Sequence, residues 1–157
     1  MKWMAVAAIA FLMAACNGHY EVGDYYRDGD VEGIVMEADE QGNPLMLLSL
    51  EEASNLDADS AAVWASKLGD GRWRLPDKKE MESLRINRSL LNMTLERKGL
   101  PLFLMPSTFY WTSQPCSETH MYACGPYGVQ CYFRTNKSVH YRARAVKMTV
   151  NSDTNAL

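Results

Sequence analysis

Four side chains in the last third of the chain are of types that bind zinc or act as nucleophiles. Cys116, His120, Cys124 and Cys131 follow one another at spacings of four, four and seven positions. All four are potential zinc ligands, but the set lacks the paired C-x-x-C knuckles of common structural zinc sites. No flanking signature places a histidine base beside a cysteine nucleophile. We therefore expect neither a metal site nor a catalytic pair here, and we expect disulfide formation instead.

The number of cysteines available for pairing depends on Cys16. If Cys16 carries a lipid, Cys116, Cys124 and Cys131 remain, and one disulfide with one free thiol is the simplest arrangement in an exported protein. A bond between Cys124 and Cys131 would staple the glycine- and proline-rich turn between them. Bonds from Cys116 to either partner stay open, because sequence does not fix disulfide connectivity.

The N-terminus has the features of a lipoprotein signal peptide. Lys2 provides a positive charge, residues 3–12 are apolar, and the segment L-M-A-A-C ends at Cys16. The apolar stretch is too short to cross a hydrocarbon layer of about 30 Å as a helix. We expect residues 1–15 to be removed and residues 16–23 to form a lipidated tether. This predicts a location in the bacterial cell envelope, at the outer membrane, with the membrane face left open.

Composition limits the partners and the number of domains. The chain has 157 residues and a formal net charge of -3, with 16 Lys and Arg against 19 Asp and Glu and no basic run. This argues against nucleic-acid binding, which depends on clustered cations that neutralise phosphates. Residues 24–150 suffice for one domain, and residues 151–157 are expected to be a flexible tail.

Strand and helix signals follow one another along this domain. Residues 31–38 and 45–50 flank a Gly-Asn-Pro turn and predict a β-hairpin, whose second strand is almost continuously apolar and should lie inside its sheet. Asp57 or Asp59 can cap a first helix, Asp77 with Glu80 forms a capping-box pattern for a second, and Asn87 opens a third.

The last third of the chain has the texture of β-structure. Aromatic and β-branched residues gather at 109–111, 129–133 and 139–150. Strands first, helices next and strands last predict an α+β domain, with the terminal strand beside the early hairpin. Pro76 marks a corner between strand and helix, at which Trp73 and Leu75 should point into the core.

Several ordered motifs resemble one family. G-R-W-R-L-P at residues 71–76, Y-W-T-S at 110–113 and Y-R-A-R-A-V-K at 141–147 resemble the Lcl C-terminal-domain-like family of bacteria, as found in short lipoproteins. The motif positions are Trp73, Arg74, Leu75, Pro76, Glu80, Tyr110, Trp111 and Arg144.

The resemblance implies a fold and a type of function. It implies a C-type-lectin-like domain, with a small twisted antiparallel sheet and two or three short helices, and adhesion or ligand binding, often to glycans. The R-L-P segment also resembles formylglycine-generating enzymes, which implies a cysteine-dependent oxidase as a less favoured alternative, because those enzymes are longer and use a close cysteine pair.

Aromatic residues of the last third supply the candidate ligand contacts. Tyr122 and Tyr127 belong to the turn-rich segment, and Trp111 and Arg142 are further candidates. On the last strand Arg142 and Arg144 should share one face, as salt-bridged scaffold or as part of a site, while the opposite face packs inward. Asp59-Ser60-Ala61 resembles an O-glycosylation acceptor of gut anaerobes, although helix capping explains it equally well.

Together these features predict a lipid-anchored, non-enzymatic binding module. We expect an adhesin-like envelope protein that recognises a glycan or a protein partner through residues 106–140, without a cofactor. The alternative is a structural subunit of an envelope or fimbrial assembly.

Overall fold

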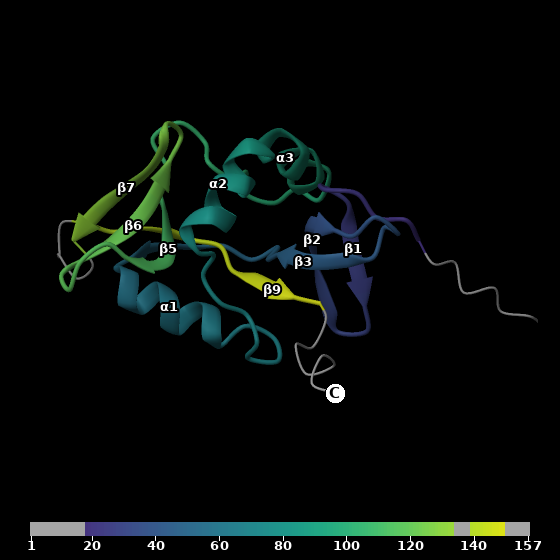
Figure 1. The fold of residues 1–157 in the computed structure, drawn as a ribbon, viewed down its shortest axis with the longest axis horizontal. Coiled ribbons are helices and arrows are strands. Elements are labelled where there is room, and N and C mark those ends of the chain that lie inside the picture. Colours follow the sequence, from purple (N-terminus) through teal and green to yellow (C-terminus); the bar gives the residue numbers. More distant parts are fainter. Residues whose placement is uncertain (1–17, 134–138, 150–157) are drawn as a thin grey trace, which may run out of the picture.

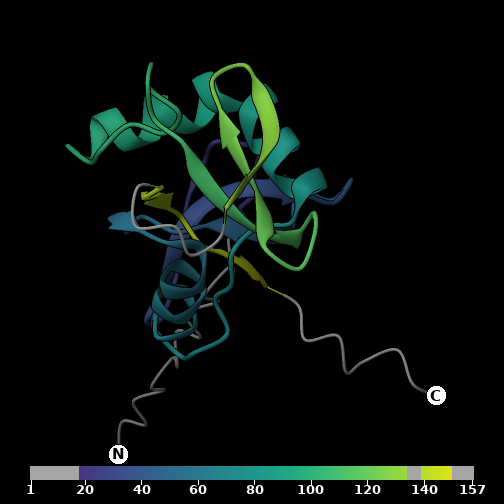
Figure 2. The same cartoon turned by 90° about the vertical axis from the view of Figure 1, so that its left-hand side faces the viewer.

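The computed structural model describes residues 18–133 and 139–149 (Figure 1; Figure 2 shows it turned by 90°). The predicted signal peptide, the lipidation site Cys16 and the predicted tail therefore lie outside the described residues. Within them the chain is α+β, as predicted, with two sheets and three short helices. No helix in this part of the chain combines the length and the apolar character needed to cross a membrane.

The first sheet joins the two ends of the domain. Its strands are β1 (Tyr25–Asp28), β2 (Val31–Ala38), β3 (Pro44–Leu48) and β9 (Val146–Met148), all antiparallel in the order β1-β2-β3-β9. The predicted hairpin is thus confirmed, with its second strand inside the sheet. Leu47 and Leu48 are fully buried because both faces of β3 are covered. The end of the chain returns beside the hairpin as predicted, through residues 146–148, whereas residues 141–143 of the predicted last strand pair in the second sheet.

The second sheet contains the aromatic segments. Its order is β4-β8-β5-β6-β7, and only the β5–β8 pair is parallel. Strand β6 was not predicted, because its residues lack the β-branched side chains that mark strands. The bounds are β4 (Ala53–Leu56), β5 (Tyr110–Pro115), β6 (His120–Gly125), β7 (Gly128–Phe133) and β8 (Tyr141–Ala143).

Three helices connect the sheets, and their starts follow the predicted signals. Asp57 rather than Asp59 caps α1, accepting a hydrogen bond from the backbone N–H of Ser60. Asp77 and Glu80 form the reciprocal capping box of α2. Asn87 precedes the third helix without a side-chain cap. The helices span Ala58–Ser66 (α1), Lys78–Ile86 (α2) and Arg88–Arg97 (α3).

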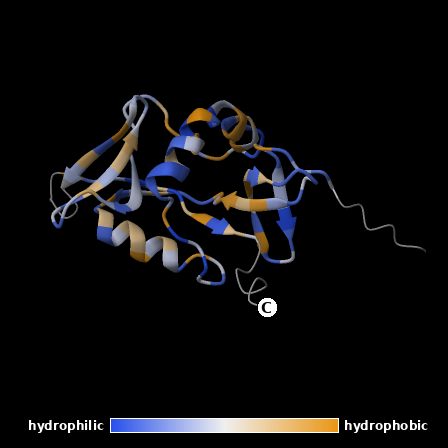
Figure 3. Cartoon of the chain, viewed as in Figure 1, coloured by the Kyte–Doolittle hydropathy of each residue, from blue (hydrophilic) through white to orange (hydrophobic). Residues whose placement is uncertain are grey.

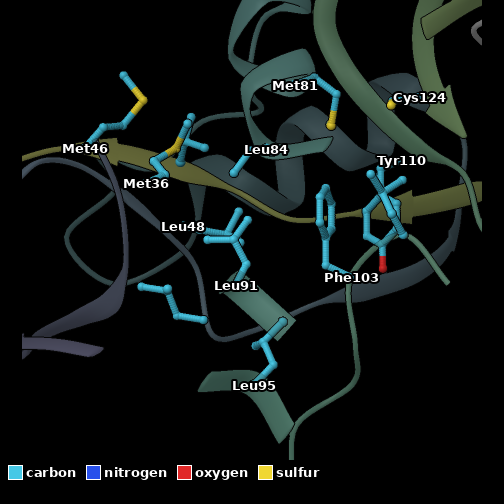
Figure 4. Close-up of a cluster of buried hydrophobic side chains, with 13 residues drawn as sticks. Met36, Met46, Leu48, Met81, Leu84, Leu91, Leu95, Phe103, Tyr110 and Cys124 are labelled. Carbon is cyan, nitrogen blue, oxygen red and sulfur yellow. The ribbon is translucent and has the colours of Figure 1, made fainter. Parts of the chain in front are cut away.

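Two apolar clusters form the core. One lies beneath α2 and α3 and contains Phe103, Tyr110 and Cys124 (Figure 4). The other lies beside α1 and contains Trp73 and Trp111. Apolar residues concentrate along β3, α1 and parts of α3 (Figure 3).

The corner before α2 has the predicted structure. Trp73 and Leu75 are buried, with 7% and 2% of their surface exposed. Arg74 is exposed, and its guanidinium lies 2.7 Å from the Glu80 carboxylate. The motif residues Arg74, Pro76 and Glu80 therefore fix the approach of the chain to α2.

The folded domain begins before residue 24. The N–H of Tyr20 donates to the carbonyl of Gly42, the Tyr20 ring packs edge-on against Tyr26, and the N–H of Gly23 donates to Val35. The expected tether of residues 16–23 is therefore too long. The hydrogen bond to Gly42 holds Tyr20 against the β2–β3 turn, so the ordered domain begins four residues earlier than predicted.

Candidate functional site

The structure joins Cys116 to Cys131 and leaves Cys124 as a buried thiol. Of the pairings that the sequence left open, Cys116 with Cys131 forms, and the suggested Cys124–Cys131 staple does not. The register of the β6–β7 hairpin explains why, since Cys131 pairs with Tyr122 and Cys124 pairs with Val129. Cys124 and Cys131 are therefore diagonal neighbours across the hairpin, and the Cα atoms of such neighbours are about 7–8 Å apart, beyond the usual disulfide range. The Cα atoms of Cys116 and Cys131 are 6.3 Å apart.

The weak zinc candidates are not brought together. Cys116 and Cys131 are consumed by the disulfide, and burial raises the pKa of the Cys124 thiol to about 11. A protonated thiol is neither a ligand nor a nucleophile at neutral pH. The His120 ring is held by the hydroxyls of Ser117 and Thr119. Among residues 18–133 and 139–149, no three His, Cys, Asp or Glu side chains are placed to hold a metal ion.

The predicted ligand contacts are also dispersed. Tyr127 is 97% exposed at the tip of the β6–β7 turn, whereas the half-buried Tyr122 ring lies 4.6 Å from the Nζ of Lys78. Trp111 is fully buried, and its indole N–H donates to the carbonyl of Leu56. As a ligand contact Trp111 is therefore corrected to a core residue.

Arg142 and Arg144 belong to a buried scaffold. Both donate to the carboxylate of Glu52, which also accepts the hydroxyl of Tyr110. Arg144 has no exposed surface. The prediction that only the opposite face of this strand packs inward is therefore incomplete, because Arg144 is buried as well. Burial and the Glu52 carboxylate raise the pKa of Tyr110 well above its ordinary value. The salt-bridged scaffold proposed for the arginines is confirmed.

A cavity of about 450 Å³ lies elsewhere in the molecule. It is bordered by the β1–β2 turn, the residues that follow β3, the loop after α1 and one residue of β9. Figure 1 places these elements on the side away from α3. Five separate segments contribute to the wall. The lining residues are Asp30, Val31, Glu32, Ser49, Leu50, Glu51, Leu68, Gly69, Asp70, Trp73 and Lys147.

One ion pair organises the cavity wall. Lys147 is 4% exposed, and its Nζ lies 2.7 Å from the Asp70 carboxylate and 5.9 Å from the centre of the Trp73 ring. The hydrogen bond from this ammonium holds the pKa of Asp70 well below its ordinary value, and Arg72 also binds the carboxylate. Asp70 is therefore ionised throughout the physiological range.

The remaining polar groups give the cavity an acidic character. Asp30 and Glu51 are exposed, and with Asp70 they set three acidic residues against Lys147, whereas the Glu32 carboxylate accepts the hydroxyl of Tyr25. Carboxylates accept hydrogen bonds from hydroxyl and amino groups. The arrangement therefore suits a ligand rich in donors rather than an anion.

Two glycines shape the space around Trp73. A Cβ at Gly33 would come within 2.8 Å of the Leu48 carbonyl oxygen, and a Cβ at Gly69 would come within 3.2 Å of the Trp73 indole nitrogen. Gly69 also has a backbone φ of +48°, a value that residues with a side chain rarely adopt. Gly33 lets β2 lie close to β3 and to the indole, and Gly69 lets the loop after α1 lie close to the indole nitrogen.

Sequence reasoning missed this cavity. Trp73 belongs to the core, as predicted, and also lines the cavity, whereas no sequence pattern marks Lys147 as its neighbour. The glycines that flank Asp70 beside Trp73 were the one local signal, because such a loop allows a close approach to an aromatic ring. Comparison with protein-family models finds no match, and no curated protein matches the chain.

Proposed function

We propose that this chain is a lipid-anchored envelope protein that binds a glycan in the cavity beside Trp73. The observation that carries the proposal is the meeting of an indole, a buried ammonium and three acidic residues, Asp30, Glu51 and Asp70, around a space of about 450 Å³. Trp73 is 7% exposed, so only the part of its ring that borders the cavity can touch a sugar, and a few placed polar groups fix the orientation of the sugar. The proposed site therefore moves from residues 106–140 to this cavity.

The charge of the cavity defines the class of glycan. The carboxylates of Asp30, Glu51 and Asp70 outweigh the ammonium of Lys147 and the guanidinium of Arg72, so uronic and sialic acids would be repelled. Hydroxyl groups of neutral sugars and the ammonium group of an amino sugar would donate to the carboxylates. The proposed ligand is a neutral or amino-sugar glycan.

The architecture supports the proposed C-type-lectin-like fold. Two small sheets, three short helices and a terminal strand beside the N-terminal hairpin agree with the family resemblance of the motifs. The sequence ending at Cys16 supports the anchor. Incorporation of a radioactive fatty acid that disappears in Cys16→Ala tests the anchor separately from the glycan site.

Binding is tested with the disulfide-bonded protein and a panel of neutral, amino and acidic oligosaccharides. Glu51→Gln removes an exposed cavity carboxylate and should weaken binding about tenfold or more, because a hydrogen bond to a charged group contributes about 1.5–3 kcal/mol. Glu37→Gln is the matched control, since Glu37 is an exposed glutamate of β2 outside the cavity.

Two results would overturn the glycan site. Calorimetry could show no binding to any oligosaccharide of the panel at millimolar concentration. Alternatively, Glu51→Gln and Glu37→Gln could bind with the same affinity as the unaltered protein, which would place the ligand elsewhere. Preference for acidic sugars would contradict the proposed class.

The second candidate function is a structural subunit of an envelope or fimbrial assembly. It is favoured by the exposed Tyr127 at the tip of the hairpin and by β7, which is one of the two edge strands of its sheet. Recovery of a stoichiometric complex that Tyr127→Ala disrupts would support it. The oxidase alternative is disfavoured, because Cys116 and Cys131 are joined and the thiol of Cys124 is protonated and buried.

A further inference from the structure

The outer face of α3 carries apolar side chains that the core does not use. Leu90 and Met93 are 46% and 48% exposed, one helical turn apart, whereas Leu91 and Leu95 on the other side of the helix are fully buried. Ile86, the last residue of α2 and two residues before the start of α3, is 73% exposed. Ile86, Leu90 and Met93, together with the basic residues that flank them, are called the α3 face below.

The α3 face is basic, although the chain is acidic. Residues 85–98 contain four Lys and Arg against one Glu, in a protein with a formal net charge of -3. The four are Arg85, Arg88, Arg97 and Lys98, of which Arg85 pairs with Glu82 in the preceding turn. Exposed apolar residues flanked by cations are typical of helices that lie on anionic lipid surfaces.

Helix α3 lies directly against the start of the domain. The Thr94 hydroxyl donates to the carbonyl of Gly23 at 2.6 Å, and the Nζ of Lys98 lies 3.3 Å from the centre of the Tyr25 ring. Gly23 also touches Leu90, since a Cβ at Gly23 would lie 3.0 Å from the Cβ of Leu90. Figure 1 shows the N-terminal lead-in leaving the domain beside this helix.

The proposed anchor is close to the same face. Tyr20 is hydrogen-bonded to the domain, and four residues of extended chain from Cys16 span at most about 14 Å. A lipid on Cys16 would therefore hold Tyr20 within that distance of the membrane surface. The start of α3 is reached three residues later, through the contact between Gly23 and Leu90.

We propose that the α3 face docks on an anionic phospholipid surface beside the lipidated Cys16. This inference rests on the anchor in the proposed function and adds a second membrane contact that fixes the orientation of the domain. The apolar side chains enter the boundary between headgroups and acyl chains, and Arg97 and Lys98 contact the phosphates.

The test uses the acylated protein in vesicles and two single substitutions, Met93→Cys and Val63→Cys. Val63 is the matched control, because it is 52% exposed on α1, which Figure 1 shows on the opposite side of the molecule. A nitroxide label would react with the new thiol alone, because Cys16 is blocked, Cys124 is buried and Cys116 is bonded to Cys131.

The measurement is the access of each label to oxygen, which enters lipid, and to a nickel complex, which stays in water. Vesicles of phosphatidylcholine with phosphatidylglycerol should raise the oxygen-to-nickel ratio several-fold at position 93 and leave it unchanged at position 63. Phosphatidylcholine alone should give a smaller change, because the basic residues then lack anionic headgroups.

Mass analysis of Cys16 separates the two proposals. An acylated Cys16 with an aqueous label at position 93 overturns the docking and leaves the anchor standing. An immobile label at position 93 that oxygen does not reach also overturns it, since a protein partner would then cover the face. Absence of acyl groups on Cys16 overturns the anchor and, with it, the docking that depends on it.

Discussion

The charge network around Glu52 gives the sharpest stability prediction. Substituting Glu52→Gln keeps the size of the side chain and removes the negative charge that compensates Arg144. Arg144 has no exposed surface, and Glu52 is 5% exposed. Removing one partner of a buried pair costs about 3–5 kcal/mol, because the other charge stays in a poorly solvating environment.

Two features of the structure place the effect at the lower end of that range. The Arg144 guanidinium keeps the backbone carbonyls of Ser49, Leu50 and Pro101 as acceptors. The side chain of Arg142 is 38% exposed, so water replaces part of its lost interaction with Glu52. We expect Glu52→Gln to lower the free energy of unfolding by about 3 kcal/mol, and the melting temperature by about 6–12 °C.

The assay is urea unfolding at pH 7 with the disulfide intact. Glu51→Gln is the matched control, because the neighbouring Glu51 is exposed, and its effect should stay within about 0.5 kcal/mol. A double-mutant cycle with Arg144→Met isolates the pair, and its coupling energy should exceed about 1 kcal/mol. If Glu52→Gln and Glu51→Gln unfold at the same urea concentration, the argument that Arg144 needs Glu52 is refuted.

Three further predictions concern the cysteines and the cavity. Removing the disulfide with Cys116→Ser should lower the free energy of unfolding by about 3 kcal/mol, as expected for a bond that closes a loop of this size, and an unchanged denaturation curve would contradict it. Cys124 should resist alkylation at pH 7 and react only in denaturant, because burial raises its pKa to about 11; mass analysis that finds it alkylated in the folded protein would refute this. Asp70 has a lowered pKa, so its contribution is present above the ordinary value of 3.8 and is lost as the pH falls below it. Unfolding measured from pH 5 to pH 2 should therefore be less pH-dependent in Asp70→Asn, and equal slopes would exclude the pairing with Lys147.

Local signals predicted most of the elements. The capping pair Asp77 and Glu80 located the start of α2, and the apolar run of residues 45–50 identified an interior strand. Both depend on contacts between residues close in sequence, which the sequence displays directly. The return of the last strand to the hairpin was predicted from the order of the elements alone.

Interactions across long separations were predicted less well. The alternation in residues 141–147 could not reveal that Arg144 is buried, because its acceptors come from residues 49–52 and 101. The Cys116–Cys131 bond likewise depends on the register of β6 and β7, which sequence does not display. The cavity needs five segments at once, so no local pattern contained it.

The two proposals together determine how the protein would be oriented. Figure 1 shows α3 on one side of the domain, and the β1–β2 turn with the loop after α1 on the other. The cavity lies between that turn and that loop. If the α3 face rests on the bilayer, Asp30, Glu51 and Asp70 therefore open away from the membrane and its anionic headgroups. An acidic site would gain from this separation, because the negative surface potential that attracts Arg97 and Lys98 falls off within about 8–10 Å at physiological salt. Docking would thus present the cavity to soluble glycans, while a protein held only by a flexible lipidated segment could turn it toward the lipid.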